Sequence, residues 1–151
     1  MSISKKTWAR ITLFFLFCSN FFFYTDTTAV SVSLSNLETE FNLSGFGVAS
    51  IMLSYMITYS LMTPILSAQE KKYTSFRLII FGLFIYILST TGFSVSTNYA
   101  SIIVSRILMG VAEGSFSAIA TSYVDTIAPK KFKSTWIGIF SLAMGVGGAS
   151  G

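Results

Sequence analysis

The chain has 151 residues, of which 52% are hydrophobic and only 11% are charged, and its formal net charge is +4. A soluble domain carries about a quarter charged residues, so this composition, with a mean hydropathy of +0.69, excludes a water-soluble globular protein and indicates that most side chains face lipid. Because histidine is absent and cysteine occurs once, Ser-His or Cys-His catalysis, a disulfide framework and a metal cluster are excluded, and we expect no enzyme, cofactor or metal.

Five apolar segments follow one another, and each is expected to be a membrane-spanning helix. They cover about residues 8–30, 46–66, 76–95, 100–124 and 134–151. Each complete segment has roughly 20 to 25 residues, enough to cross a hydrocarbon core about 30 Å thick at about 1.5 Å per residue. Membrane strands would require the alternating pattern of a closed barrel, which the sequence lacks. The expected fold class is an all-α polytopic membrane protein with four complete helices and most of a fifth.

The connections between these segments carry capping and turn signals. Leu34, Leu37 and Phe41 continue at helical spacing beyond residue 30, so the first helix is expected to extend past its apolar part. Ser44 is the expected N-cap of the second helix. Short polar or proline-containing stretches are expected to separate the later helices, at residues 67–75, 97–99 and 129–131.

The first apolar segment has a second interpretation, as a cleaved signal peptide with its small residues around Ala29. However, its apolar run exceeds the 7 to 15 residues or so that are usual for such a signal. Asp26 also lies just before the candidate cleavage site. A retained helix is therefore the favoured interpretation.

The basic residues predict how the chain is oriented. They form three groups, before the first segment and after the second and fourth: Lys5, Lys6 and Arg10; Lys71, Lys72 and Arg77; Lys130, Lys131 and Lys133. The other connections contain Glu38 and Glu40 and neither Lys nor Arg. If the helices alternate in direction, every basic end lies on one side, which the positive-inside rule assigns to the cytoplasm together with the N-terminus. These clusters are thus a topology signal, and we expect no nucleic-acid partner; a plasma membrane and an endosomal or lysosomal membrane fit equally.

Three formal charges are expected to lie within the hydrocarbon, away from the basic helix ends: Asp26, Arg106 and Glu113. A charged side chain at a helix centre costs about 2.5–3.5 kcal/mol on insertion scales, so each is expected to face a shared polar interior. Counting from the helix ends places Asp26 and Arg106 at similar depth, which predicts an ion pair between them. Glu113 lies near the middle of its span and is the candidate group for taking up and releasing a proton. The alternatives are purely structural: an ion pair that locks helices together, and a Glu113 that only bonds a neighbouring serine.

In three of the expected helices, residues of similar chemistry fall on one face: polar residues in the fourth, hydroxyl residues in the second and small residues in the fifth. Since seven residues at about 100° return almost to the starting direction, one face of the fourth segment carries Arg106, Gly110, Glu113 and Ser117. Gly110 would be a notch where another backbone or a substrate approaches. The second segment repeats hydroxyls every four residues, at Ser50, Ser54 and Thr58, which either edge a polar cavity or bond their own helix. The fifth has small residues expected to permit close packing, at Gly145, Gly147, Gly148 and Gly151.

The fourth segment also carries the most specific motif of the sequence. From Arg106 to Ala120 it reads R-I-L-M-G-V-A-E-G-S-F-S-A-I-A. This resembles the fourth helix of the major facilitator superfamily, and most closely its spinster-type lipid transporters, which read R-x-L-x-G-x-G-E-A-S-[YF]-S-x-I-A. Ala112 and Gly114 replace the family's second glycine and its following alanine. Tyr24 and Asp26 also match the family's N-Y-x-D-R at the end of the first helix, whereas Phe23 and Thr27 replace its Asn and Arg.

The resemblance implies the N-terminal part of the first six-helix half of a twelve-helix transporter, with the substrate bound between the halves. It implies a secondary, proton-linked carrier that moves a lipid or other amphipathic organic solute by alternating access. Glu113 would then accept the proton, while Asp26 and Arg106 form and break an ion pair. The implied partners are the bilayer, a small-molecule or lipid substrate, protons and further helices beyond residue 151. The alternatives are a major facilitator for a sugar or organic anion, held by Arg106, and a truncated or degenerate protein that does not transport.

One connection departs from the family pattern. The superfamily's loop after the second helix reads G-x-x-x-D-[RK]-x-G-[RK]-[RK], whereas residues 67–77 read S-A-Q-E-K-K-Y-T-S-F-R. Only Glu70, Lys71 and Lys72 approximate its acidic and basic centre. In relatives this loop helps to stabilise the outward-facing state, so the resemblance implies a weakened or rebuilt gating loop. The length of the chain implies the front of a longer protein or a truncated product.

Overall fold

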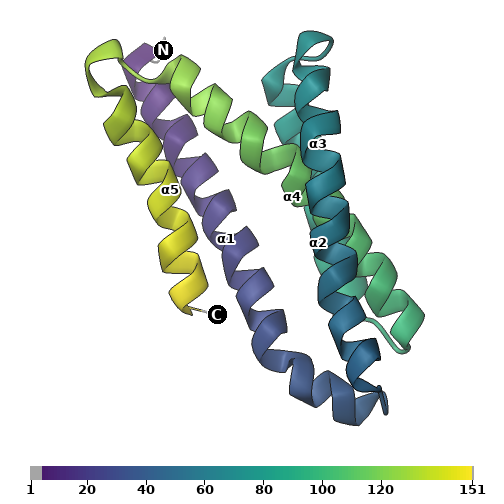
Figure 1. Cartoon of the computed structure of the whole chain (residues 1–151). Coiled ribbons are helices and arrows are strands. Elements are labelled where there is room, and N and C mark those ends of the chain that lie inside the picture. The colour runs from purple at the N-terminus through teal and green to yellow at the C-terminus, as the bar shows by residue number, and fades with distance from the viewer. Residues whose placement is uncertain (1–4, 151) are drawn as a thin grey trace. The chain divides into compact units, whose positions relative to one another are not determined.

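The computed structural model describes residues 5–150, and within that range the chain is built from helices without strands (Figure 1). The helices are α1 (Lys5–Glu40), α2 (Gly45–Ala68), α3 (Ser75–Ser94), α4 (Tyr99–Ile127) and α5 (Lys133–Ser150), with short 3₁₀ helices at Gln69–Lys71 and Lys130–Phe132. Among the described residues, α1 to α4 are long and apolar enough to cross a membrane. The expected all-α fold class is confirmed.

The end of α1 follows from local backbone chemistry. The helix continues through Leu34 and Leu37 to Glu40, so the expected extension beyond residue 30 is confirmed. Asn42 then takes a positive φ of 53°, a conformation that asparagine tolerates better than most residues. The Leu43 amide donates to the Glu38 carbonyl oxygen at 3.0 Å, the bond that closes a Schellman-type helix end.

The other connections are tied by side chains close in sequence. The Ser44 hydroxyl accepts a 3.3 Å hydrogen bond from the Gly47 amide, so the predicted N-cap of α2 is confirmed. Before α4, the Asn98 side chain accepts a 2.9 Å bond from the Ser101 amide, which satisfies one of the unpaired donors at a helix start. Between α4 and α5, the Lys133 ammonium forms a 2.7 Å ion pair with Asp125.

The chain comprises two compact units that share α1 and α4. One, here called the terminal unit, contains Met1–Val30 and Ala120–Gly151. The other, called the central unit, contains Ser31–Ile119. The terminal unit therefore contains the apolar part of α1, the last turns of α4 and the whole of α5. The central unit contains α2, α3 and most of α4. Each unit has its own helix contacts.

In the terminal unit, α1 packs closely against α5. A Cβ atom at Gly147 would lie 2.6 Å from the Phe21 carbonyl oxygen and 3.0 Å from the Tyr24 Cβ atom, so only glycine fits between these backbones. The buried Asn20 amide adds a 3.2 Å hydrogen bond to the Phe140 carbonyl oxygen. Gly145 meets nothing within 4 Å, and Gly151 lies outside the described residues. The predicted close packing of α5 is therefore made at Gly147.

In the central unit, α4 packs against α3 through small residues. A Cβ atom at Gly82 of α3 would lie 3.0 Å from the Ala112 carbonyl oxygen, and one at Gly92 would lie 3.0 Å from the Ser105 hydroxyl. In the most apolar 18-residue segment of each helix, the buried share is 61% for α4, 22% for α3 and 11% for α2. The helix that carries the predicted polar face is thus the most enclosed of the spans.

Candidate transport site

The candidate site lies in the central unit, where α2 and α4 meet at two glycines one turn apart. A Cβ atom at Gly110 would lie 2.7 Å from the Tyr55 carbonyl oxygen and 2.8 Å from the Tyr59 nitrogen, while one at Gly114 would lie 3.1 Å from the Thr63 nitrogen. Both glycines therefore let the α2 backbone touch α4. The expected notch at Gly110 exists, and its occupant is a helix backbone.

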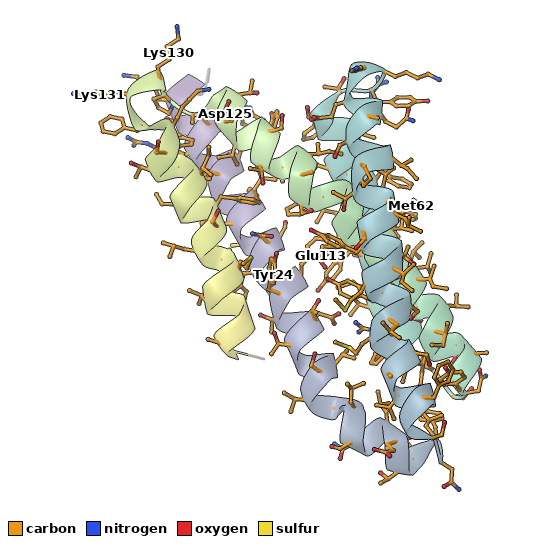
Figure 2. The ribbon with its side chains drawn as sticks, viewed as in Figure 1. Tyr24, Met62, Glu113, Asp125, Lys130 and Lys131 are labelled. Carbon is orange, nitrogen blue, oxygen red and sulfur yellow. The ribbon has the colours of Figure 1, made fainter. Side chains whose placement is uncertain are left out.

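This close approach brings a carboxylate of α4 against a hydroxyl of α2. Glu113 is the middle residue of α4 and is 3% exposed (Figure 2). The Tyr55 hydroxyl, from a side chain that is itself buried, donates a short hydrogen bond to the Glu113 carboxylate. Hydrogen bonds to an ionised acceptor are about twice as strong as neutral ones. The contact therefore fixes α2 and α4 to each other through an ionisable group.

A second tyrosine repeats the arrangement one turn further along. The Tyr59 hydroxyl lies 3.4 Å from the Ser117 hydroxyl of α4. The rings of Tyr55 and Tyr59 stack, with their centroids 6.1 Å apart and their planes 25° apart. Because Glu113 and Ser117 are four residues apart on α4, two tyrosines at the same spacing on α2 meet them in register. The polar face predicted for the fourth segment is thus matched by a tyrosine face on α2.

Arg106 lies on the same helix as Glu113, about two turns earlier. It is 2% exposed, and its guanidinium carbon lies 4.7 Å from the centroid of the Phe93 ring of α3. At this distance the cation is attracted to the negative face of the ring, and the attraction grows when water is excluded. Phe93 therefore helps to hold a buried positive charge in the central unit.

The structure brings some of the predicted site residues together and leaves others apart. Gly110, Glu113 and Ser117, which the sequence placed on one face of α4, all contact α2. By contrast, the Ser54 and Thr58 hydroxyls donate to carbonyls of their own helix, at 2.9 and 2.8 Å, which is the simpler of the two interpretations given to them. Thr58 still takes part through its Cβ atom, which faces Gly110.

Asp26 belongs to the other compact unit. It lies on the part of α1 assigned to the terminal unit and is partly buried. Arg106 belongs to the central unit. Their ion pair therefore stays a prediction.

The candidate gating loop is organised by its own short contacts. Glu70 accepts a 2.9 Å hydrogen bond from the Ser75 hydroxyl at the start of α3. The Lys72 ammonium lies 5.5 Å from the centroid of the neighbouring Tyr73 ring, and Lys71 is exposed. The acidic residue of the loop is thus engaged by the helix that follows it, and a gating role for these three residues stays a prediction.

Sequence reasoning missed the partners of the polar face. Tyr55 and Tyr59 follow directly after Ser54 and Thr58, two of the hydroxyl residues that were predicted to edge a polar cavity or to bond their own helix. Their four-residue spacing, which equals that of Glu113 and Ser117, was the available signal. The Gly110–Gly114 pair is likewise a small-x-x-x-small pattern of the kind that lets membrane helices approach closely.

Among the described residues, four helices are able to span a membrane, and the charged side chains of Arg106 and Glu113 are buried within them. These features define a polytopic membrane protein with an internal polar site. Comparison with protein families gives the class its name. The Major Facilitator Superfamily model matches residues 16–151, and the chain belongs to that superfamily. Its members are carriers rather than enzymes.

Individual relatives agree with the spinster resemblance. The chain is 31% identical to "Probable sphingolipid transporter spinster homolog 1" of Arabidopsis thaliana, over 83% of the chain and 26% of the relative. It is 33% identical to spinster homolog 2 of the same plant, over 78% of the chain and 24% of the relative. A "Hexuronate transporter" of Bacillus subtilis is 23% identical over 91% of the chain and 32% of the relative. The chain spans about a quarter of the length of the two spinster homologs.

Proposed function

We propose that this chain supplies the first helices of a secondary transporter that moves a lipid or other amphipathic organic solute by alternating access. Its superfamily and its likeness to the spinster homologs support this class of substrate. The observation that carries the mechanism is the Tyr55–Glu113 hydrogen bond across the α2–α4 contact. It places a group that can bind a proton at the point where two spans touch.

The proton-linked step follows from the chemistry of that bond. An ionised Glu113 accepts a charge-assisted hydrogen bond from Tyr55, and protonation replaces it with a weaker neutral one. Proton uptake therefore loosens the α2–α4 contact, and movement of α2 away from α4 in turn favours the protonated carboxyl. A conformational change that separates these helices is thereby linked to proton binding, as linkage requires.

The remaining elements of the proposal come from the charged residues. Asp26 and Arg106 would form an ion pair in one transport state and separate in the other. Glu70, Lys71 and Lys72 would act as the gating loop on the cytoplasmic side, where the positive-inside rule also places the N-terminus. The chain would form the N-terminal part of a six-helix half, completed by further helices of the whole protein.

The proposal is tested by transport in proteoliposomes that contain the whole protein, with a fluorescent lysolipid as substrate and an imposed pH gradient. Glu113→Gln keeps the shape of the side chain and removes its charge, so uptake should no longer respond to the gradient. Glu38→Gln removes the same charge at an exposed position near the end of α1 and should keep the gradient dependence. A Glu113→Gln protein whose uptake still follows the gradient would contradict the proton-linked mechanism.

A second candidate is transport of a sugar acid or another organic anion. The likeness to a hexuronate transporter and the buried cation Arg106 favour it. If Arg106 holds a substrate carboxylate through two parallel hydrogen bonds, Arg106→Lys should abolish anion uptake, because lysine lacks that planar fork. If the substrate is a lipid and Arg106 only pairs with Asp26, Arg106→Lys should retain much of the lipid uptake.

A further inference from the structure

A cavity of about 450 Å³ lies in the terminal unit, and the transport proposal makes no use of it. Its volume falls within the range of small-molecule sites. Lys6 and Arg10 of α1 line one side, while Ile127, Pro129, Phe132 and Trp136 line the other. It therefore lies where the start of α1, the end of α4 and the start of α5 come together.

The lining of this cavity combines positive charge with apolar and aromatic surface. The lining residues that the structure describes include no acidic side chain. The nearby carboxylate of Asp125 is engaged by Lys133 at 2.7 Å. The Lys131 ammonium lies 5.8 Å from the centroid of the Phe132 ring, and Lys130 and Lys131 project from the same connection (Figure 2). A ligand that suits these walls has an anionic group for the cations and an apolar part for the rings.

The cavity lies at the ends of the helices, where a membrane-spanning chain meets the lipid headgroups, and this position favours a lipid as the ligand. It lies at the helix ends that carry the basic residues, the side that the positive-inside rule assigns to the cytoplasm. Tryptophan is enriched at the membrane–water interface, and the lining residue Trp136 lies in the first turn of α5. The lipids of the cytoplasmic leaflet are partly anionic, and basic pockets between spans on that side bind their headgroups.

We propose that this cavity binds an anionic phospholipid of the cytoplasmic leaflet. Lys6 and Arg10 hold the phosphate of the headgroup, and the glycerol and upper acyl chain lie along Phe132 and Trp136. Such a lipid would link α1 to the α4–α5 connection at the interface. The proposal is independent of the substrate and of Glu113.

Trp136 supplies the probe for this site. The chain has two tryptophans, and Trp8 is 56% exposed and does not line the cavity. With Trp8→Phe, the emission of Trp136 alone is followed in phosphatidylcholine nanodiscs that contain a fixed fraction of brominated phosphatidylglycerol or brominated phosphatidylcholine. Bromine quenches tryptophan at short range. We expect a preference for phosphatidylglycerol of at least about fivefold, the contribution of one interfacial cation.

Two charge-matched variants locate the effect. Lys6→Gln combined with Arg10→Gln should reduce the preference by about fivefold or more, and both side chains are exposed, so the substitutions leave the helix packing intact. Lys71→Gln combined with Lys72→Gln removes the same two charges from another basic connection and should keep the preference. Equal quenching by the two lipids, or an unchanged preference in the Lys6/Arg10 variant, would overturn the proposal. A saturable response of Trp136 to inorganic phosphate without a lipid preference would also overturn it, because the site would then take the free anion.

Discussion

In both the central and the terminal unit, two helix backbones approach each other at a glycine, and the two units differ in the hydrogen bond that joins the same pair of helices. In the central unit Gly110 admits the α2 backbone, and in the terminal unit Gly147 admits the α1 backbone. A Cβ atom added at either glycine would lie at nearly the same distance from a carbonyl oxygen, 2.7 Å and 2.6 Å respectively. Beside Gly110, however, Tyr55 binds the ionisable Glu113. On the α1–α5 contact, Asn20 binds the backbone carbonyl of Phe140.

Under the proposed mechanism, this difference separates a fixed contact from one that would respond to protons. A backbone carbonyl keeps its acceptor strength at any physiological proton concentration, so the α1–α5 contact has one state. A carboxylate changes its acceptor strength when it binds a proton, so under the proposed mechanism the α2–α4 contact would have two states. Close helix packing is common to both units, and the proposed function rests on the titratable partner in the central unit.

We expect the largest loss of stability when the glycine contacts that both units share are filled. Gly110→Val and Gly147→Val each force a side chain into a backbone that cannot move aside, and overpacking of this kind costs about 1–3 kcal/mol or more. Thermal unfolding of the chain in detergent, followed by circular dichroism, should show a large loss of stability for both. Gly145→Val, at a position that meets nothing within 4 Å, is the control and should unfold near the temperature of the parent chain. If all three unfold alike, the close approaches do not stabilise the units.

We expect the second largest loss of stability when the Tyr55–Glu113 hydrogen bond of the central unit is removed. Tyr55→Phe removes the hydroxyl that binds Glu113, and loss of a hydrogen bond to a charged group costs about 1.5–3 kcal/mol. The same unfolding assay should show this loss near neutral pH and a smaller loss in acid, where a protonated Glu113 makes a weaker bond. Tyr73→Phe, at a ring that is 42% exposed, should change little. A Tyr55→Phe loss that is the same in acid and at neutral pH would contradict an ionised acceptor.

A smaller effect is expected for the matching bond of the terminal unit. Asn20→Leu keeps the side-chain size and removes the 3.2 Å bond to the Phe140 carbonyl oxygen. Neutral hydrogen bonds between membrane helices contribute about 0.6 kcal/mol on average, so the loss should be modest and independent of pH. A pH-dependent loss here would erase the distinction between the two units.

The smallest effect is expected at the surface of the terminal unit. Lys133 and Asp125 form a 2.7 Å ion pair, but their side chains are 42% and 47% exposed. Exposed pairs contribute about 0–1 kcal/mol and are screened by salt. Lys133→Gln should therefore shift the unfolding temperature slightly at low salt and not measurably at high salt. A large, salt-independent shift would mean that the pair is a structural anchor.

The sequence predicted the spans and the polar face better than it predicted the pairing between helices. Apolar length and the positions of Ser44 and Pro129 marked helix ends because these depend on neighbouring residues. The spacing of Arg106 and Glu113 predicted a shared face because helical geometry is regular. The choice of Tyr55 as the partner of Glu113 depends on how α2 and α4 slide against each other. That register is set by Gly110 and Gly114 together and is not contained in either helix alone.

The most direct test of the central claim is infrared difference spectroscopy of the chain in nanodiscs, recorded between acidic and neutral pH. We expect a carboxyl band that appears on acidification, is absent from Glu113→Gln, shifts in frequency in Tyr55→Phe and is unchanged in Asn20→Leu. A spectrum that is the same in the parent chain and in Glu113→Gln would show that Glu113 binds no proton in this range. The proposed link between protons and the α2–α4 contact would then be contradicted.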